Sequence, residues 1–255
     1  MIRCLTIAVV FIMMTLVLLP FQLIAMALRL PIQKSIPHFY HRMLCKVIGV
    51  RIREVGQRAP DIPLLILSNH ASWLDILIIG AVTQTVFVAK KEVAGWPVFG
   101  WLAKLQRTVF IDRERRHRTG AATQEIAERL LGGDAVVLFA EGTSSDGNRI
   151  LPFRSALVGA VHHAIGQSTD HETVTVQPLS LAYVQTSGLP IGRALRDRVA
   201  WYGDADLIPH LVSVLASGAV DVTVSWGQPV AYGMDANRKI IAQRAEDEVR
   251  RMTSA

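Results

Sequence analysis

The sequence predicts an α/β fold, in which a mixed sheet is flanked by helices and preceded by a membrane-anchoring helix or helix pair. Short apolar runs alternate with helix-like segments over most of the chain, as in sheets covered by helices. The first thirty residues are almost entirely apolar, which is typical of a membrane anchor. The length of 255 residues suits one sizeable domain plus such an anchor.

The predicted strands are short apolar runs bounded by polar or turn-forming residues. They are Leu64–Ser68, Thr85–Ala89, Thr108–Ile111, Ala135–Ala140, Val174–Ala182 and Val220–Trp226. The predicted helices lie between and after these runs. They are Trp73–Ala81, Pro97–Lys104, Glu114–Leu131, Ser155–Ala164, Leu207–Ala216 and Ala236–Met252.

The stretch Cys4–Leu28 contains only three polar side chains, those of Thr6, Thr15 and Gln22. As one helix it would span roughly 37 Å, more than the roughly 30 Å of a bilayer's hydrocarbon core. Pro20 interrupts the run and favours a kink, so two membrane-embedded helical pieces are an alternative to one spanning helix.

The cations around this stretch predict its orientation. Arg3 alone precedes it, whereas many Lys and Arg residues follow, so the positive-inside rule places the rest of the chain in the cytoplasm, at the cytoplasmic (inner) membrane. A cleavable signal peptide is the rival interpretation, because Leu5–Leu19 is followed by the small-residue pattern Ala25-Met26-Ala27. Pro37–Val50 has apolar residues at helical spacing among basic ones, which favours an amphipathic helix on the bilayer or on the domain. The predicted divisions are 1–30 as anchor, 31–54 as interfacial helix and 55–255 as catalytic domain.

Charge and cysteine content narrow the range of partners. The net charge of +6 favours anionic partners such as membrane surfaces, phosphorylated substrates or nucleic acid. Cys4 and Cys45 form neither a disulfide framework nor a zinc-binding spacing, and we expect no metal. No phosphate-binding glycine motif is present, so we expect no nucleotide cofactor.

Polar residues follow four of the predicted strands, where an open α/β sheet binds its ligands. His70 is the natural general base among them, and Asp75 is placed to orient its ring. Ser72 and Asp75 read as a capping box that begins a helix at Trp73, which allows His70 to fold back toward the first turn. The plain alternative is a capping aspartate beside an ordinary loop histidine.

Four blocks in order resemble the glycerolipid acyltransferases, the lysophosphatidate acyltransferase family, over roughly residues 60–185. Asn69–Asp75 is similar to the family's NHxSxxD motif, and Val109–Arg113 to its second motif. Phe139–Gly147 resembles the third, usually written FPEGTRS, and Val176–Ser180 the fourth.

The resemblance implies functions for individual residues. His70 would be the general base for the acceptor hydroxyl, and Asp75 would orient it. Arg113 would bind the phosphate of the acceptor, because a guanidinium donates two parallel hydrogen bonds. The remaining residues implied in acceptor binding are Glu141, Gly142 and Thr143, with Glu141 orienting Arg113 or nearby backbone amides.

Two departures from the family pattern bear on the acceptor. Ala140 replaces the proline of the third motif, and Ser144 replaces the arginine after Glu-Gly-Thr. Arg149 or Arg154 is available to replace that cation from the adjacent loop. The expected acceptor is 1-acylglycerol-3-phosphate, giving phosphatidic acid, and the alternative is lyso-ornithine lipid, whose head group carries no phosphate.

The sequence therefore predicts a membrane-bound O-acyltransferase that uses acyl-CoA or acyl-carrier protein as donor and a lysophospholipid as acceptor, without cofactor, metal or covalent enzyme intermediate. A lipid hydrolase is a distant alternative, because Asp146 stands where a GxSxG motif has its last glycine. A non-enzymatic membrane protein or nucleic-acid binder leaves the ordered motifs unexplained, so we expect the lipid bilayer as partner and no nucleic acid.

Overall fold

The computed structural model describes residues 2–112, 119–168 and 171–254. Its centre is a mixed sheet in the order β1-β8-β6-β2-β5-β3-β4, and β7 and β9 pair with β6 outside that path. The strands are β1 (Val50–Val55), β2 (Leu64–Ser68), β3 (Val86–Lys90), β4 (Val109–Ile111), β5 (Ala135–Phe139), β6 (Thr173–Thr186), β7 (Leu189–Pro190), β8 (Val220–Trp226) and β9 (Val230–Gly233).

The five strands β6, β2, β5, β3 and β4 are parallel, whereas β8 runs antiparallel to β6. The predicted mixed sheet is thus confirmed. Strand β2 is apolar except for its last residue and fully buried, as expected of a central parallel strand covered on both faces.

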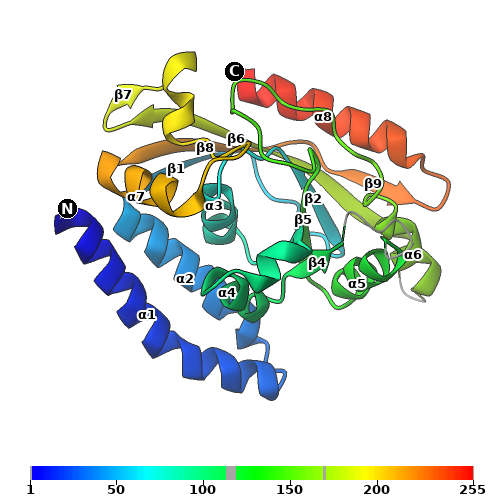
Figure 1. Cartoon of the computed structure of the whole chain (residues 1–255). Coiled ribbons are helices and arrows are strands. Elements are labelled where there is room, and N and C mark those ends of the chain that lie inside the picture. Colours follow the sequence, from blue (N-terminus) through cyan, green and yellow to red (C-terminus); the bar gives the residue numbers. More distant parts are fainter. Residues whose placement is uncertain (1, 113–118, 169–170, 255) are drawn as a thin grey trace.

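Helices cover both faces of the sheet (Figure 1). One apolar core packs α2, α3 and α7 against the sheet, and the other packs α5, α6 and α8. The helices are α1 (Ile2–Ala27), α2 (Ile32–Ile48), α3 (Leu74–Val82), α4 (Phe99–Leu105), α5 (Thr119–Leu131), α6 (Ala160–Gln167), α7 (Leu207–Ser217) and α8 (Arg238–Ser254), with 3-10 helices at η1 (Lys91–Gly95) and η3 (Arg193–Arg198).

The sheet begins earlier than the predicted domain boundary at residue 55. Strand β1 pairs in parallel with β8, from Val50 opposite Val220 to Val55 opposite Ser225. Because β1 carries charged side chains, its residues up to 54 were assigned to the interfacial helix. In the structure α2 ends at Ile48 and is capped by Gly49 in a left-handed conformation. The predicted start of the Glu114–Leu131 helix lies outside the described residues.

Helix α1 is one continuous helix of 26 residues through Pro20, so the chain does not divide there into two pieces. By length and composition it is able to cross a membrane, and only 6% of its apolar window is buried. Both of its ends contact the rest of the protein. Arg3 donates hydrogen bonds to carbonyl oxygens at the ends of α2 and α7, including Gly218 O at 2.9 Å, and Gln22 donates to Leu105 O at 2.8 Å.

Candidate active site

The parallel strands bring the predicted polar clusters together at the carboxyl ends of the strands. Strands β2, β5 and β3 run side by side in the same direction, and the chain leaves β2 toward His70 and β5 toward Glu141 at those ends. Because parallel strands share their carboxyl ends, residues 71 positions apart become neighbours.

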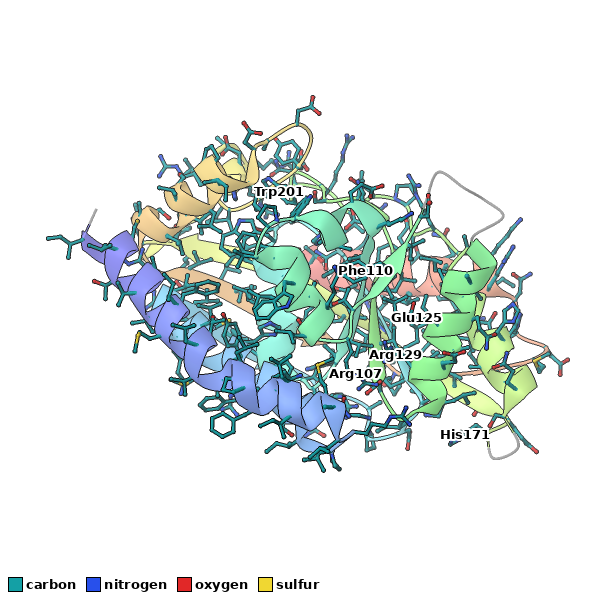
Figure 2. All side chains as sticks on the ribbon, turned by 60° about the horizontal axis from the view of Figure 1, so that its bottom comes forward. Arg107, Phe110, Glu125, Arg129, His171 and Trp201 are labelled. Carbon is teal, nitrogen blue, oxygen red and sulfur yellow. The ribbon has the colours of Figure 1, made fainter. Side chains whose placement is uncertain are left out.

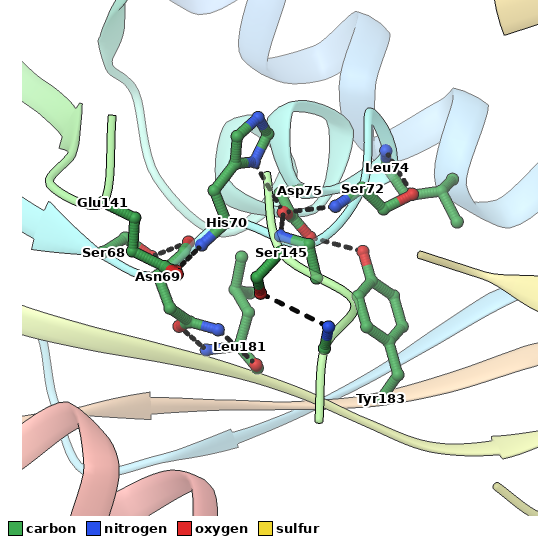
Figure 3. Close-up of polar contacts among 12 residues, drawn as sticks. Ser68, Asn69, His70, Ser72, Leu74, Asp75, Glu141, Ser145, Leu181 and Tyr183 are labelled. Carbon is green, nitrogen blue, oxygen red and sulfur yellow. Dashed lines mark hydrogen bonds and ion pairs between the residues drawn. The ribbon is translucent and has the colours of Figure 1, made fainter. Parts of the chain in front are cut away.

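His70 and Asp75 are in contact, as the sequence predicted (Figure 3). Nδ1 of His70 lies 2.8 Å from Oδ2 of Asp75, whose side chain is fully buried. The imidazole also stacks on Phe139, with ring centroids 4.0 Å apart. The carboxylate fixes Nδ1 as the protonated nitrogen, so Nε2 carries the free lone pair that a general base needs.

Asp75 also holds the loop that carries His70. Its Oδ2 accepts hydrogen bonds from the backbone N–H of Ala71 at 2.7 Å and of Ser72 at 2.9 Å. Ser72 Oγ in turn accepts from the N–H of Leu74, where α3 begins, one residue later than predicted. Half of the expected capping box is thus present, the bond from Ser72 N–H to Asp75, whereas Ser72 Oγ bonds the N–H of Leu74 rather than that of Asp75. The contact with Asp75 holds His70 over the start of α3.

Tyr183 completes the environment of the carboxylate and was missed by the sequence analysis. Its hydroxyl donates to Oδ1 of Asp75 from β6, 108 residues away in the chain. Burial, followed by the negative charge of Asp75, raises the pKa of Tyr183 well above its usual value, so the hydroxyl stays protonated and remains a donor. A long apolar strand with one tyrosine offers no signal for this contact.

Glu141 fastens two loops together. Its Oε1 accepts from the backbone N–H of His70 at 2.7 Å, and its Oε2 accepts from that of Leu151 at 2.8 Å. Burial raises the pKa of Glu141 to about 7, although these two backbone donors favour the ionised form. Of the two functions expected for Glu141, the orientation of backbone amides is present. Arg113, the other expected partner, lies outside the described residues.

Gly142 allows a close approach that a side chain would prevent. It has a φ of +75°, and a Cβ there would lie 3.0 Å from Cδ and 3.1 Å from Nε of Arg154. The guanidinium stem of Arg154 therefore packs directly on the Glu-Gly-Thr turn. Arg154 is exposed, and it lies against Gly142 of the third motif, two positions before Ser144 in the chain.

An apolar cavity of about 560 Å³ leads away from His70. Thr143 and Ser144 line it together with His70, and the face of α1 from Ile7 to Gln22 forms one wall. Those 15 helical steps correspond to roughly 22 Å of wall length. The cavity is therefore long and lined mostly by apolar side chains, which suits an extended hydrocarbon chain.

Two tryptophans that the sequence analysis did not single out also line this cavity. Trp96 and Trp201 meet edge to face with ring centroids 5.9 Å apart. The backbone N–H of Trp201 donates to Ala71 O at 2.7 Å, which ties this wall to the His70 loop. Both come from irregular segments, where spacing carries no information about tertiary contacts.

Comparisons with known proteins agree with this arrangement. Residues 49–182 match the family model described as acyltransferase. The chain is 47% identical to a lyso-ornithine lipid O-acyltransferase of Brucella abortus (strain 2308), over 98% of this chain and 93% of that one. It is 43% identical to the Rhizobium meliloti (strain 1021) enzyme of that name, over 95% and 83%.

A 1-acyl-sn-glycerol-3-phosphate acyltransferase of Neisseria gonorrhoeae is 29% identical, over 77% of this chain and 72% of that protein. The fold matches the crystal structure of the 1-acyl-sn-glycerophosphate acyltransferase PlsC of Thermotoga maritima with a TM-score of 0.66 at 20% identity, covering 99% and 95% of the two chains. The chain belongs to the glycerolipid acyltransferase family.

Proposed function

We propose that this acyltransferase transfers a fatty acyl group from a thioester to the hydroxyl of lyso-ornithine lipid. The observation that carries the proposal is the 47% identity to the Brucella enzyme over nearly the whole of both chains. The substitution of Ser144 for the family's arginine supports it, because an acceptor without a phosphate needs one cation fewer.

In the proposed reaction His70 Nε2 removes the proton of the acceptor hydroxyl while Asp75 stabilises the imidazolium. The hydroxyl oxygen attacks the thioester carbonyl, a carbon–oxygen bond forms and the carbon–sulfur bond breaks. The departing thiolate takes the proton back from His70, so atoms and charges balance without a metal, a cofactor or an acyl-enzyme.

The developing oxyanion needs hydrogen-bond donors near His70. The N–H of Gly142 donates to Phe139 O at 3.0 Å, and that of Ser145 donates to His70 O at 2.8 Å. Within the described ranges, the amides of Thr143 and Ser144 donate no backbone hydrogen bond, and both residues line the same cavity as His70. We assign the oxyanion to these two backbone amides.

The apolar cavity is the proposed site of the acyl chain, and acyl-CoA or acyl-carrier protein is the proposed donor. Glu141, Gly142 and Thr143 are then positioning residues for the acceptor, with Arg154 as the cation beside them. Arg113 remains a predicted acceptor ligand. In the proposed pose of lyso-ornithine lipid, the carboxylate of the head group pairs with Arg154 and the ammonium lies toward Ser144.

A second acceptor, 1-acylglycerol-3-phosphate, is favoured by one observation. Arg154 lies against the motif whose arginine is missing, so the site retains a cation that is able to bind a phosphate. The similarity to the Neisseria enzyme is in line with this candidate but is lower and covers less of the chain.

The deciding experiment measures kcat/KM of the purified enzyme for both acceptors with a labelled acyl donor. We expect lyso-ornithine lipid to be preferred, and Ser144→Arg to lower that preference because the added cation faces the ornithine ammonium. Ser254→Arg, at an exposed position on α8, is the matched control for added charge. A wild-type preference for 1-acylglycerol-3-phosphate would establish the second acceptor instead.

We also propose that α1 lies along the bilayer surface on the cytoplasmic side of the inner membrane, rather than crossing the bilayer. A spanning helix carries one end away from the catalytic domain by roughly 30 Å. Here Arg3 and Gln22, near opposite ends of α1, both bind carbonyl oxygens outside α1. The exposed apolar side chains of α1 supply the surface that enters the lipid.

A further inference from the structure

A second cavity lies at the amino ends of the parallel strands, whereas His70 follows the carboxyl end of β2. It has a volume of about 360 Å³ and is formed where β3 and β5 begin, with the start of α2 closing one side. In Figure 2, Trp201, which lines the acyl cavity, lies near the top of the view, and Arg107, which lines the second cavity, lies in its lower half. Pro37 and Gln106 line both cavities, so the two adjoin there. Nothing in the proposed reaction uses this second cavity.

Cations outnumber carboxylates on its wall. Asp134, only 3% exposed, accepts two hydrogen bonds from Arg107 at 3.0 and 2.8 Å and pairs with Lys34 at 2.9 Å. One carboxylate therefore faces two cations, which leaves one positive charge in excess. Lys34 further donates to the carbonyl oxygens of Gly132 and Gly133, so these three side chains form a rigid floor.

Arg58 adds a second excess charge to the same cavity. No carboxylate of the described residues lies within ion-pair distance of it, and its Nε is buried without a partner. Burial lowers the pKa of Arg58, as expected for a cation that loses water without gaining an anion.

The backbone around Arg58 is held in place by a buried glutamine. Gln177, in β6 and fully buried, accepts from the N–H of Ala59 at 2.8 Å and donates to Gln57 O at 2.9 Å. The residues on both sides of Arg58 are thus fastened to the core. The backbone that carries the guanidinium is therefore fixed, and a ligand has to order only the side chain of Arg58.

We propose that this cavity binds a phosphate-type oxyanion through Arg58, in the field of Arg107 and Lys34. A guanidinium with unused donors matches the geometry of such an anion, and the two excess charges favour it. The exposed apolar residue Ile62 lines the cavity, and the exposed Leu30 and Ile32 directly precede Gln33 and Lys34 of its wall in the chain. The phosphate of an anionic phospholipid and free inorganic phosphate share this chemistry.

The test uses the full chain in non-ionic detergent micelles and follows its thermal unfolding midpoint. Inorganic phosphate is titrated against chloride of equal ionic strength, and phosphatidylglycerol is added to the micelles against phosphatidylcholine. We expect phosphate, phosphatidylglycerol or both to raise the midpoint, and Arg58→Gln to need roughly tenfold or more ligand for the same shift. A shift by phosphatidylglycerol at much lower concentration identifies the lipid, and a shift by inorganic phosphate alone identifies the free ion.

Arg53→Gln is the matched control, because Arg53 is exposed on β1 and does not line the cavity. Should Arg58→Gln not fold, Arg58→Lys retains the charge without the paired donors and should show a several-fold weaker response. An unresponsive wild-type protein, a full response in the folded Arg58 variants, or an equal loss in Arg53→Gln would overturn the proposal. Acyl transfer is not part of the readout, so the outcome is independent of the proposed reaction.

Discussion

The hydroxyl of Tyr183 donates a hydrogen bond to one oxygen of Asp75, while the other oxygen of the same carboxylate receives Nδ1 of His70. A fully buried carboxylate is thus surrounded by donors, two of them from the backbone of the loop that carries His70. The side chain of Asp75 therefore holds the ring of His70, its loop and strand β6. Replacing the donor side chain of His70 or of Tyr183 removes one of these contacts at a time.

Replacement of His70 by alanine should lower kcat by roughly 10² to 10⁴-fold, the usual range for loss of a general base. The protein should remain folded, because the ring is not part of either apolar core. The measurement is acyl transfer to lysolipid by purified enzyme, with His163→Ala, an exposed histidine on α6, as control. Near-normal transfer by His70→Ala would refute the proposed mechanism.

Tyr183→Phe should reduce kcat by roughly tenfold, because one oxygen of a buried carboxylate loses its donor at a cost of about 1–3 kcal/mol. The measurement is kcat and KM for acyl transfer by the purified variant. KM should change little, because Tyr183 does not line the cavity beside His70.

The matched control is Tyr232→Phe, at a fully buried tyrosine whose hydroxyl has no partner among the described residues. That variant should leave kcat unchanged. A wild-type kcat in Tyr183→Phe would mean that Tyr183 supports packing alone.

Gly80→Ala should destabilise the contact between α2 and α3. A Cβ at this position would lie 1.7 Å from Nδ1 of His41, a ring that is only 6% exposed and has little room to move. Overpacking of this kind costs about 1–3 kcal/mol. The check is the unfolding midpoint in detergent.

Gly166→Ala, in α6, should instead stabilise the protein by about 0.5–1 kcal/mol. No heavy atom lies within 4 Å of the Cβ that the substitution adds, and alanine is the better helix former.

The double variant Gly80→Ala with His41→Ala should recover part of the stability that Gly80→Ala loses, because the clashing ring is removed. Equal midpoints for Gly80→Ala and wild type would show that the ring of His41 moves freely.

The sequence predicted the sheet well where strands are uniformly apolar, because burial on both faces leaves a continuous signal, as in Leu64–Ser68. It missed β1, whose charged residues alternate with apolar ones on a half-exposed strand. The contact of His70 with Asp75 was predictable because it is local and begins a helix.

The remaining parts of the site depend on long-range packing. Tyr183 is 108 residues from Asp75, and Trp201 reaches the His70 loop from an irregular segment. The position of Arg154 depends on the left-handed conformation of Gly142, which spacing does not reveal. The second cavity likewise requires Gln177 to hold residues 57 and 59, 120 and 118 positions away.

The pH dependence of stability should carry a contribution from Glu141. Its pKa is raised from 4.5 to about 7 by burial, so the folded protein holds this proton more tightly than the unfolded chain does. The resulting stabilisation is full below about pH 4.5 and is lost as the pH rises toward 7. Glu141→Gln removes the titration, so its midpoint should change less than that of wild type across this window. Parallel curves for the two proteins would contradict the raised pKa.

The last prediction concerns α1, which is both the proposed membrane-binding surface and one wall of the acyl cavity. Deletion of residues 1–27 should weaken membrane association and leave an attachment that high salt releases, because the basic residues of α2 remain. It should also lower transfer of long acyl chains more than that of short ones, since the cavity loses the wall from Ile7 to Gln22.

The two effects of α1 are separable with Arg3→Gln, which keeps every apolar residue but removes the hydrogen bonds to Ile48 O and Gly218 O. This variant should bind vesicles as well as wild type and still lose chain-length preference, because the wall is no longer fixed at one end. Lys46→Gln, an exposed cation near the end of α2, is the control. If Arg3→Gln keeps the wild-type preference while the deletion loses it, α1 acts in this cavity through its apolar surface alone, and fixation of its first turn has no part in selectivity.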